Sequence, residues 1–344
     1  MTSPPTTRKS TGWSRLRTHA VRRGLGLIGL IAAVIIGLVI LSPGRRVAQV
    51  GAEENKASDG KAARTKEPGT EALDPGYFAP GACELFLPTN GNRHLVVFLD
   101  AGHGGIDPGG TGTTESGQAI SESTLTLPVE LDTMALLRAQ GFSVVVSRTA
   151  DTTVLNLGAD DVSSGALTLL GSHDDVVARD VCANDAKAAV LVGIYFDAGA
   201  SPDDAGSVTA YDQDRPFAAQ NLRLAQLVQT DVLAAMNAQG WGIPDDGAVP
   251  DSTLGSVAPN ASDSGLAAEA LSYDHLLLLG PGEPGYLDTP SEMPGALIEP
   301  LYLTDPFEGS IADSTAGQQT IAEGLARAIE QYLAPPPTPA PTTS

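Results

Sequence analysis

Short aliphatic runs recur along the middle of the chain, each bounded by polar or turn-forming residues. Apolar runs of about four to eight residues are typical of strands that a sheet buries on both faces. Strands are predicted over Leu95–Asp100, Ser143–Arg148, Ala189–Tyr195, His275–Gly280 and Ala296–Leu301.

Longer stretches between these runs carry apolar residues three and four positions apart, the spacing of a helix with one buried face. Helices are predicted over Glu122–Gln140, Asp174–Lys187, Ala218–Gln239 and Gln318–Leu333. The alternation of strands and helices predicts an α/β fold, a mostly parallel twisted sheet with helices on both faces. Ligands of such sheets bind at the carboxyl ends of the strands, so the residues after each strand are the candidate site residues.

One apolar run lies apart from this pattern, near the N-terminus. Gly24–Leu41 is 18 residues long and carries no charge, which is long enough for one transmembrane helix. Basic residues precede it, so we expect a cytoplasmic N-terminus and an extracytoplasmic bulk. The alternative is a cleaved signal peptide, with Val50-Gly51-Ala52 as the cleavage site. Membrane localisation by a single pass is the favoured prediction, and secretion the alternative.

Composition divides the chain into five parts. Residues 1–23 form a basic cytoplasmic arm, and residues 24–42 form the transmembrane segment. Residues 43–80 are rich in small and charged residues, which predicts a flexible stalk. Residues 81–334 hold the α/β domain, and the Pro/Thr-rich residues 335–344 predict a disordered tail.

The charge of the chain is strongly negative outside the cytoplasmic arm. Eight of the 20 Lys and Arg residues lie in residues 1–46, which hold no acid. The 41 Asp and Glu residues therefore face 12 bases, and the formal charge of this part is −29. Such a surface repels nucleic acid, so we expect no nucleic-acid partner.

Two cysteines, Cys83 and Cys182, leave two interpretations open. In an oxidising compartment they can pair as a disulfide. Alternatively, both are unpaired buried thiols. Two cysteines are too few for a zinc-finger type of site.

The residues after the first predicted strand carry candidate chemistry. The sequence LDAGHGG (Leu99–Gly105) flanks His103 with glycines, which leave room for its imidazole to approach an ion. Glu122 begins the first predicted helix, where a carboxylate is also an ordinary choice next to the helix dipole. Glu299 lies within the apolar run ALIEPL, where a buried carboxylate is costly without a partner.

These residues belong to an ordered set of motifs that resembles the zinc-dependent N-acetylmuramoyl-L-alanine amidases. The set is LDAGHGG, DPG (Asp107–Gly109), E-x-x-L-x-L from Glu122, SRTAD (Ser147–Asp151), R-x-x-x-A-N (Arg179–Asn184) and IEP (Ile298–Pro300). The resemblance implies that His103 and Glu122 bind zinc and that Glu299 is the catalytic acid or base. Glu115 is a poorer ligand candidate, because no helix-start pattern follows it.

The third predicted strand departs from the family pattern. Tyr195 stands where the resemblance implies a third ligand, a histidine, and a phenol is a much poorer metal donor than imidazole. Asp197 and His173 are the possible substitute ligands, Tyr195 as phenolate is another, and loss of zinc is the third outcome. His275 opens a predicted strand at the wrong edge for the site, which indicates a structural role.

Two functions remain open from the sequence. One is hydrolysis of the peptidoglycan amide that joins N-acetylmuramic acid to L-alanine of the stem peptide. The other is a catalytically impaired domain that binds peptidoglycan or regulates a partner. Peptidoglycan is the expected partner in both, and zinc occupancy separates them.

Overall fold

The structure, a computed structural model, describes residues 70–72, 74, 76–254 and 264–335. The predicted cytoplasmic arm, the transmembrane segment, most of the stalk and nearly all of the Pro/Thr tail lie outside these residues. Within them, no helix combines the length and the apolar character needed to cross a bilayer.

Four parallel strands form the centre of the sheet, and all four were predicted. They are β3 (Val96–Ala101), β6 (Ser143–Arg148), β9 (Val190–Ile194) and β12 (Gly295–Glu299), in the spatial order β6-β3-β9-β12. Apart from the partly buried Val96, their Val, Leu and Ile side chains are buried on both faces, as the aliphatic runs indicate.

The outer strands make the sheet mixed, whereas the prediction was a mostly parallel one. On one side β2 (Ala82–Phe86) pairs antiparallel with β6, and β1 (Thr70–Ala72) pairs antiparallel with β2. On the other side β10 (Ser207–Tyr211) pairs antiparallel with β12, and β11 (Asp245–Pro250) pairs parallel with β10. The carboxyl ends of β10 and β11 therefore lie at the edge opposite to those of the central strands.

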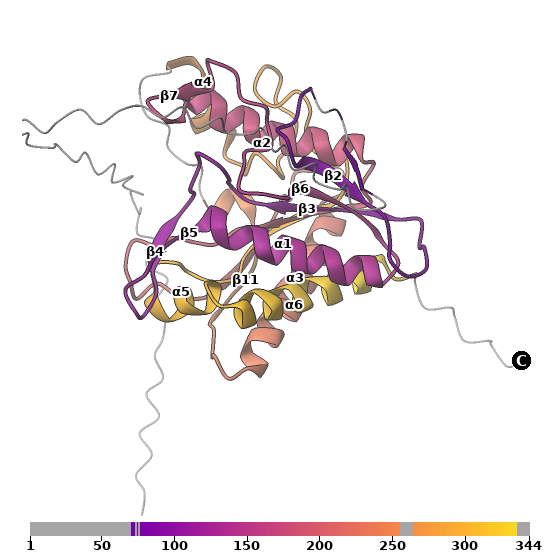
Figure 1. Ribbon diagram of the computed structural model, residues 1–344. Coiled ribbons are helices and arrows are strands. Elements are labelled where there is room, and N and C mark those ends of the chain that lie inside the picture. Colours follow the sequence, from indigo (N-terminus) through magenta and orange to yellow (C-terminus); the bar gives the residue numbers. More distant parts are fainter. Residues whose placement is uncertain (1–69, 73, 75, 255–263, 336–344) are drawn as a thin grey trace, which may run out of the picture. The chain divides into compact units, whose positions relative to one another are not determined.

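Helices cover both faces of the sheet, as predicted (Figure 1). One face packs against α1 (Glu122–Ala139), α3 (Ala218–Ala238) and α6 (Thr315–Leu333). The other packs against α2 (Leu169–Asp185), which contacts α4 (Ser264–Tyr273). Short elements complete the described chain: β4 (Thr111–Thr113), β5 (Ala119–Ser121), β7 (Val162–Ser163), β8 (Ala166–Leu167), a 3₁₀ turn (Asp251–Thr253) and α5 (Pro306–Ala312).

Two predicted elements need correction. Residues 275–280 form turns and not a strand; Leu278 and Leu279 are buried, but Asp274 just before them has a left-handed φ of 51°. Helix α2 begins at Leu169, five residues before its predicted start, because the Thr168 side chain accepts a hydrogen bond from the Gly171 backbone and caps it.

The two cysteines pair, which decides between the two interpretations of the sequence. The Cys83–Cys182 disulfide joins β2 to α2, and both residues are fully buried. It closes a loop across 99 residues of sequence separation. The covalent link fixes α2 against the strand next to β6.

Candidate active site

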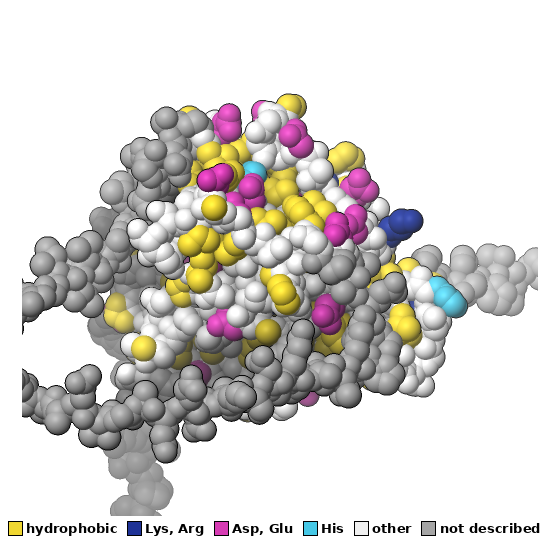
Figure 2. All heavy atoms as spheres, turned by 45° about the horizontal axis from the view of Figure 1, so that its top comes forward, with side chains coloured by type: hydrophobic (Ala, Val, Ile, Leu, Met, Phe, Trp, Pro, Cys, Tyr) yellow, Lys and Arg dark blue, Asp and Glu magenta, His cyan; other side chains and the backbone are white. Residues whose placement is uncertain are grey.

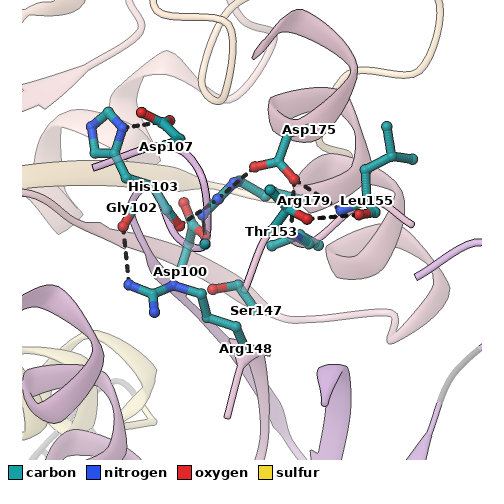
Figure 3. Close-up of polar contacts among 12 residues, drawn as sticks. Asp100, Gly102, His103, Asp107, Ser147, Arg148, Thr153, Leu155, Asp175 and Arg179 are labelled. Carbon is teal, nitrogen blue, oxygen red and sulfur yellow. Dashed lines mark hydrogen bonds and ion pairs between the residues drawn. The ribbon is translucent and has the colours of Figure 1, made fainter. Parts of the chain in front are cut away.

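His103 lies in the turn that follows β3, at the carboxyl edge of the parallel strands. Its backbone is left-handed, with a φ of 59°, and its Nδ1 lies 2.7 Å from Oδ2 of Asp107 (Figure 3). Burial alone would lower the pKa of His103, but the charge of Glu122 and the hydrogen bonds to Asp107 and Glu122 raise it to about 10. Without a metal, the imidazole is therefore a cation held between two carboxylates.

Glu122 is the first residue of α1, and its carboxylate faces the other nitrogen of the imidazole. Its Oε2 lies 3.1 Å from Nε2 of His103 and accepts a hydrogen bond from the Gly110 backbone. Its Oε1 accepts from the backbone of Phe196, just after β9. Glycine is required at position 109, just before Gly110, because a Cβ there would lie 2.5 Å from the His103 ring. The predicted pair of His103 and Glu122 is thus in direct contact.

Two buried arginines hold the turn that carries His103, and both belong to the motifs quoted above. Arg179 donates to Asp100, Asp175 and the His103 carbonyl (Figure 3). Arg148 donates to the carbonyls of Ala101, Gly102 and Ser123. No role was predicted for these arginines or for Asp107, although the SRTAD, R-x-x-x-A-N and DPG motifs contain them.

Tyr195 is directed away from the His103–Glu122 pair. Its hydroxyl donates a hydrogen bond of 3.0 Å to Oδ2 of Asp100, the buried aspartate whose Oδ1 accepts from Arg179. Its ring meets that of His103 edge-on, with 5.5 Å between the ring centroids. Burial and the charge of Asp100 raise the pKa of Tyr195 well above its ordinary value. The arrangement opposes a phenolate ligand and makes Tyr195 part of the Asp100–Arg179 network.

Glu299 ends β12, one strand away from β9, and its carboxyl is partly buried. Burial, with the charges of Asp197 and Glu122, raises the pKa of Glu299 to about 8, although the charge of His103 opposes the rise. A carboxyl with this pKa populates both protonation states near neutral pH. That property suits a group that takes up and returns a proton.

The two possible substitute ligands differ in position. Asp197 follows β9, and its carboxylate interacts with those of Glu122 and Glu299; burial raises its pKa, and a hydrogen bond from Tyr302 opposes the rise. His173 lies within α2, whereas the predicted helix began one residue after it, at Asp174. Its Nδ1 bonds Asp174 at 2.8 Å and its Nε2 bonds the Tyr286 carbonyl at 2.7 Å. Both nitrogens of His173 are therefore engaged elsewhere.

The donor set fits zinc through two protein ligands. The 3.1 Å between His103 Nε2 and Glu122 Oε2 allows both atoms to bind one ion at about 2.0–2.2 Å. Asp107 on Nδ1 lies where a carboxylate would orient the imidazole of a metal-bound histidine. Among the described residues, no third Asp, Glu, His or Cys ligand atom lies within 4.8 Å of both.

Comparisons with known proteins agree with the motifs. The family model described as N-acetylmuramoyl-L-alanine amidase matches residues 97–331. The chain is 25% identical over 253 residues to the N-acetylmuramoyl-L-alanine amidase AmiA of Salmonella typhimurium, covering 71% of this chain and 77% of that protein. It is 26% identical over 251 residues to AmiC of Neisseria meningitidis, covering 70% of this chain and 53% of that protein.

A solved structure supports the fold. The CwlD amidase of Clostridioides difficile, determined in complex with the GerS lipoprotein, superposes with a TM-score of 0.50 at 20% identity. The match covers 70% of this chain and 98% of that chain. The family model spans more than half of the chain and includes the motifs around His103, Glu122 and Glu299. The chain therefore belongs to the N-acetylmuramoyl-L-alanine amidase family.

Proposed function

We propose that this protein hydrolyses the amide between the lactyl group of N-acetylmuramic acid and L-alanine of the stem peptide. The observation that carries the proposal is the contact of 3.1 Å between His103 and Glu122, with Asp107 behind the imidazole. Zinc held by His103 and Glu122 would polarise the scissile carbonyl and lower the pKa of a bound water. Asp197 could supply a third ligand only if its side chain moved, because its carboxylate does not lie within 4.8 Å of both ligand atoms of the pair.

Glu299 transfers the proton in this proposal. As a carboxylate it accepts a proton from the attacking water, and as an acid it gives that proton to the leaving amine. A pKa of about 8 allows both steps near neutral pH. Arg148 and Arg179 act indirectly, because they fix the backbone around His103 through the carbonyls of Gly102 and of His103 itself.

A cleft beside these residues offers room for the substrate. It measures about 350 Å³, and Thr111, Gly112, Gly199, Ser201 and Thr304 contribute to its lining. Thr111 directly follows Gly110, which donates to Glu122. The lining is small and uncharged, so it suits the peptide groups and sugar hydroxyls of a muropeptide.

The test is digestion of purified peptidoglycan by the full-length protein with added zinc, followed by mass spectrometry of the products. We expect free stem peptides that begin with L-alanine, and none from Glu299→Gln. Glu115→Gln is the matched control, because Glu115 is exposed and only its backbone bonds Ser310. Products from Glu299→Gln at the wild-type rate would contradict the role of Glu299.

A second function, binding of peptidoglycan without hydrolysis, is favoured by one contact. Tyr195 stands at the position of the third ligand, but its hydroxyl is hydrogen-bonded to Asp100 and does not bind in the site. In this case the wild-type protein releases no stem peptide but sediments with insoluble peptidoglycan. Retained sedimentation without cleavage, at saturating zinc, would select this function over the first.

The protein acts outside the cytoplasm in this proposal, anchored by the helix predicted over residues 24–41. The buried disulfide supports an oxidising compartment. Acidic side chains are spread over the face of the molecule that α2 and α4 cover, where basic ones are sparse, which disfavours nucleic acid as a partner (Figure 2). An immunoblot of fractionated cells should find the full-length chain with membranes, and a soluble form that begins near Glu53 would indicate signal cleavage instead.

A further inference from the structure

Three further metal-ligand side chains meet at the sheet edge opposite to His103. Asp212 follows β10 and Asp251 follows β11, and these parallel strands end in register at Tyr211 and Pro250. The two aspartates therefore leave the sheet side by side. His275 lies two residues after α4 and reaches both of them. Among the described residues, this is the one group of three such ligands whose atoms all lie within 4.8 Å of one another.

The distances in this cluster are those of ligands around one ion. Nδ1 of His275 lies 3.0 Å from Oδ2 of Asp212 and 3.5 Å from Oδ2 of Asp251. Tetrahedral zinc, with bonds of about 2.0–2.2 Å, places neighbouring ligand atoms roughly 3.3–3.6 Å apart. One imidazole with two carboxylates is a donor set that zinc accepts.

The carboxylates are buried and fixed by backbone groups. Asp212 and Asp251 are 0% and 1% exposed. Oδ1 of Asp212 accepts from the backbones of Asp214 and Arg215, and Oδ2 of Asp251 accepts from that of Leu276. Oδ2 of Asp212 faces His275 and finds no hydrogen-bond donor in the described part of the chain. A buried carboxylate oxygen without a donor is costly, and a cation would satisfy it.

The charged side chains next to the cluster do not fill the space that a cation would occupy. The guanidinium of Arg215 is turned to the carbonyls of Gly280 and Ser291, not to the carboxylates. Asp214 lies behind the other nitrogen of His275, with its Oδ2 3.8 Å from Nε2. At this distance the exposed Asp214 side chain makes no hydrogen bond to the imidazole and does not fix its orientation. The cluster therefore has three inner donors, and the guanidinium of Arg215 does not occupy the space between them.

We infer that Asp212, Asp251 and His275 bind one Zn²⁺, with water as the fourth ligand, and that this ion ties the ends of β10 and β11 to the turn after α4. The ion has a structural role here, because it joins segments that follow three different elements; the fourth position is taken by one bound water beside the partly exposed His275. The site is separate from the His103–Glu122 pair and does not depend on amide hydrolysis.

The test uses the full-length protein with the first pair removed by His103→Ala and Glu122→Gln. After dialysis against zinc-limited buffer, metal analysis should still find about one zinc per chain. Adding His275→Gln or Asp212→Asn should weaken zinc binding by more than the roughly 10–100-fold typical of outer-partner changes. Asp274→Asn is the matched control, since Asp274 is exposed and Asn tolerates its left-handed backbone.

A thermal measurement separates metal loss from misfolding. Added zinc should raise the Tm of the His103→Ala, Glu122→Gln protein and of its Asp274→Asn form, but not that of its His275→Gln form. Each metal-free variant is first checked for native circular dichroism. A folded protein that binds no zinc, or zinc that survives both His275→Gln and Asp212→Asn, would overturn the site. The first result would leave the direct contacts of His275 with the two carboxylates as the explanation of the cluster.

Discussion

The hydroxyl of Tyr195 should stabilise the fold measurably, because it is a donor to a buried charge. Tyr195→Phe removes the hydrogen bond of 3.0 Å to Asp100, whose other oxygen is held by Arg179. Hydrogen bonds to charged groups contribute about 1.5–3 kcal/mol, and the loss leaves an oxygen of Asp100 short of a donor. In a domain of this size that free energy corresponds to a decrease of roughly 3–12 °C in Tm.

Urea unfolding of the full-length protein, followed by circular dichroism, measures the change in the free energy of unfolding. Tyr77→Phe is the control, because the described residues give its hydroxyl no hydrogen-bond partner and the change removes the same atom. We expect the control to stay within about 0.5 kcal/mol of wild type. If Tyr195→Phe is as harmless as Tyr77→Phe, the Asp100 bond does not explain why Tyr195 occupies this position.

The same residue yields a gain-of-function variant. Tyr195→His should raise zinc affinity by more than the roughly 10–100-fold associated with outer-partner changes, since it supplies a third inner ligand. It should also lower stability, because Asp100 loses the Tyr195 donor. Isothermal titration calorimetry with zinc measures the change in zinc affinity. An unchanged affinity in a folded Tyr195→His protein would mean that more than one residue separates this site from a three-ligand site.

Three further changes test other parts of the account. Reduction of the Cys83–Cys182 disulfide, or replacement of both residues by serine, should lower the free energy of unfolding by about 4–5 kcal/mol in urea titrations, because it frees a loop of about 100 residues. Asp107→Asn should weaken zinc binding about 10–100-fold in isothermal titrations, because it removes the carboxylate behind His103. Burial raises the pKa of Glu130 from 4.5 to about 8, so the folded protein holds a proton on this carboxyl that the unfolded chain releases. The stability gained from this proton is complete below pH 4.5 and is lost as pH rises through 8. Urea titrations between pH 5 and 9 should therefore show a decline of up to about 1.4 kcal/mol per pH unit that Glu130→Gln lacks.

The sequence predicted the centre of the fold and missed its margins, for a physical reason. Strands such as Ser143–Arg148 are buried on both faces and therefore appear as aliphatic runs. Strand β11 carries Asp, Gly and Pro at the sheet edge, where polar groups and proline are tolerated, and its pattern is that of a loop. Leu278 and Leu279, just before Gly280, are buried in turns, and apolar character alone does not distinguish a turn from a strand.

Local motifs predicted the site better than single residues did. His103 and Glu122 meet as the motif order implied, whereas the direction of the Tyr195 hydroxyl depends on Asp100, 95 positions away in sequence. The cluster around His275 was hidden for the same reason. Its two aspartates follow strands that the apolar pattern did not reveal, so no spacing in the sequence placed them beside the histidine.

Anomalous scattering at the zinc absorption edge, from crystals of the protein grown with zinc, tests the central claim most directly. The account predicts a peak within about 2.0–2.2 Å of both Nε2 of His103 and a carboxylate oxygen of Glu122, while the Tyr195 hydroxyl stays on Asp100. A peak coordinated by the Tyr195 oxygen would contradict the assignment of Tyr195 to the buried network. No peak at the His103–Glu122 pair at saturating zinc would contradict the zinc site and the hydrolysis that depends on it.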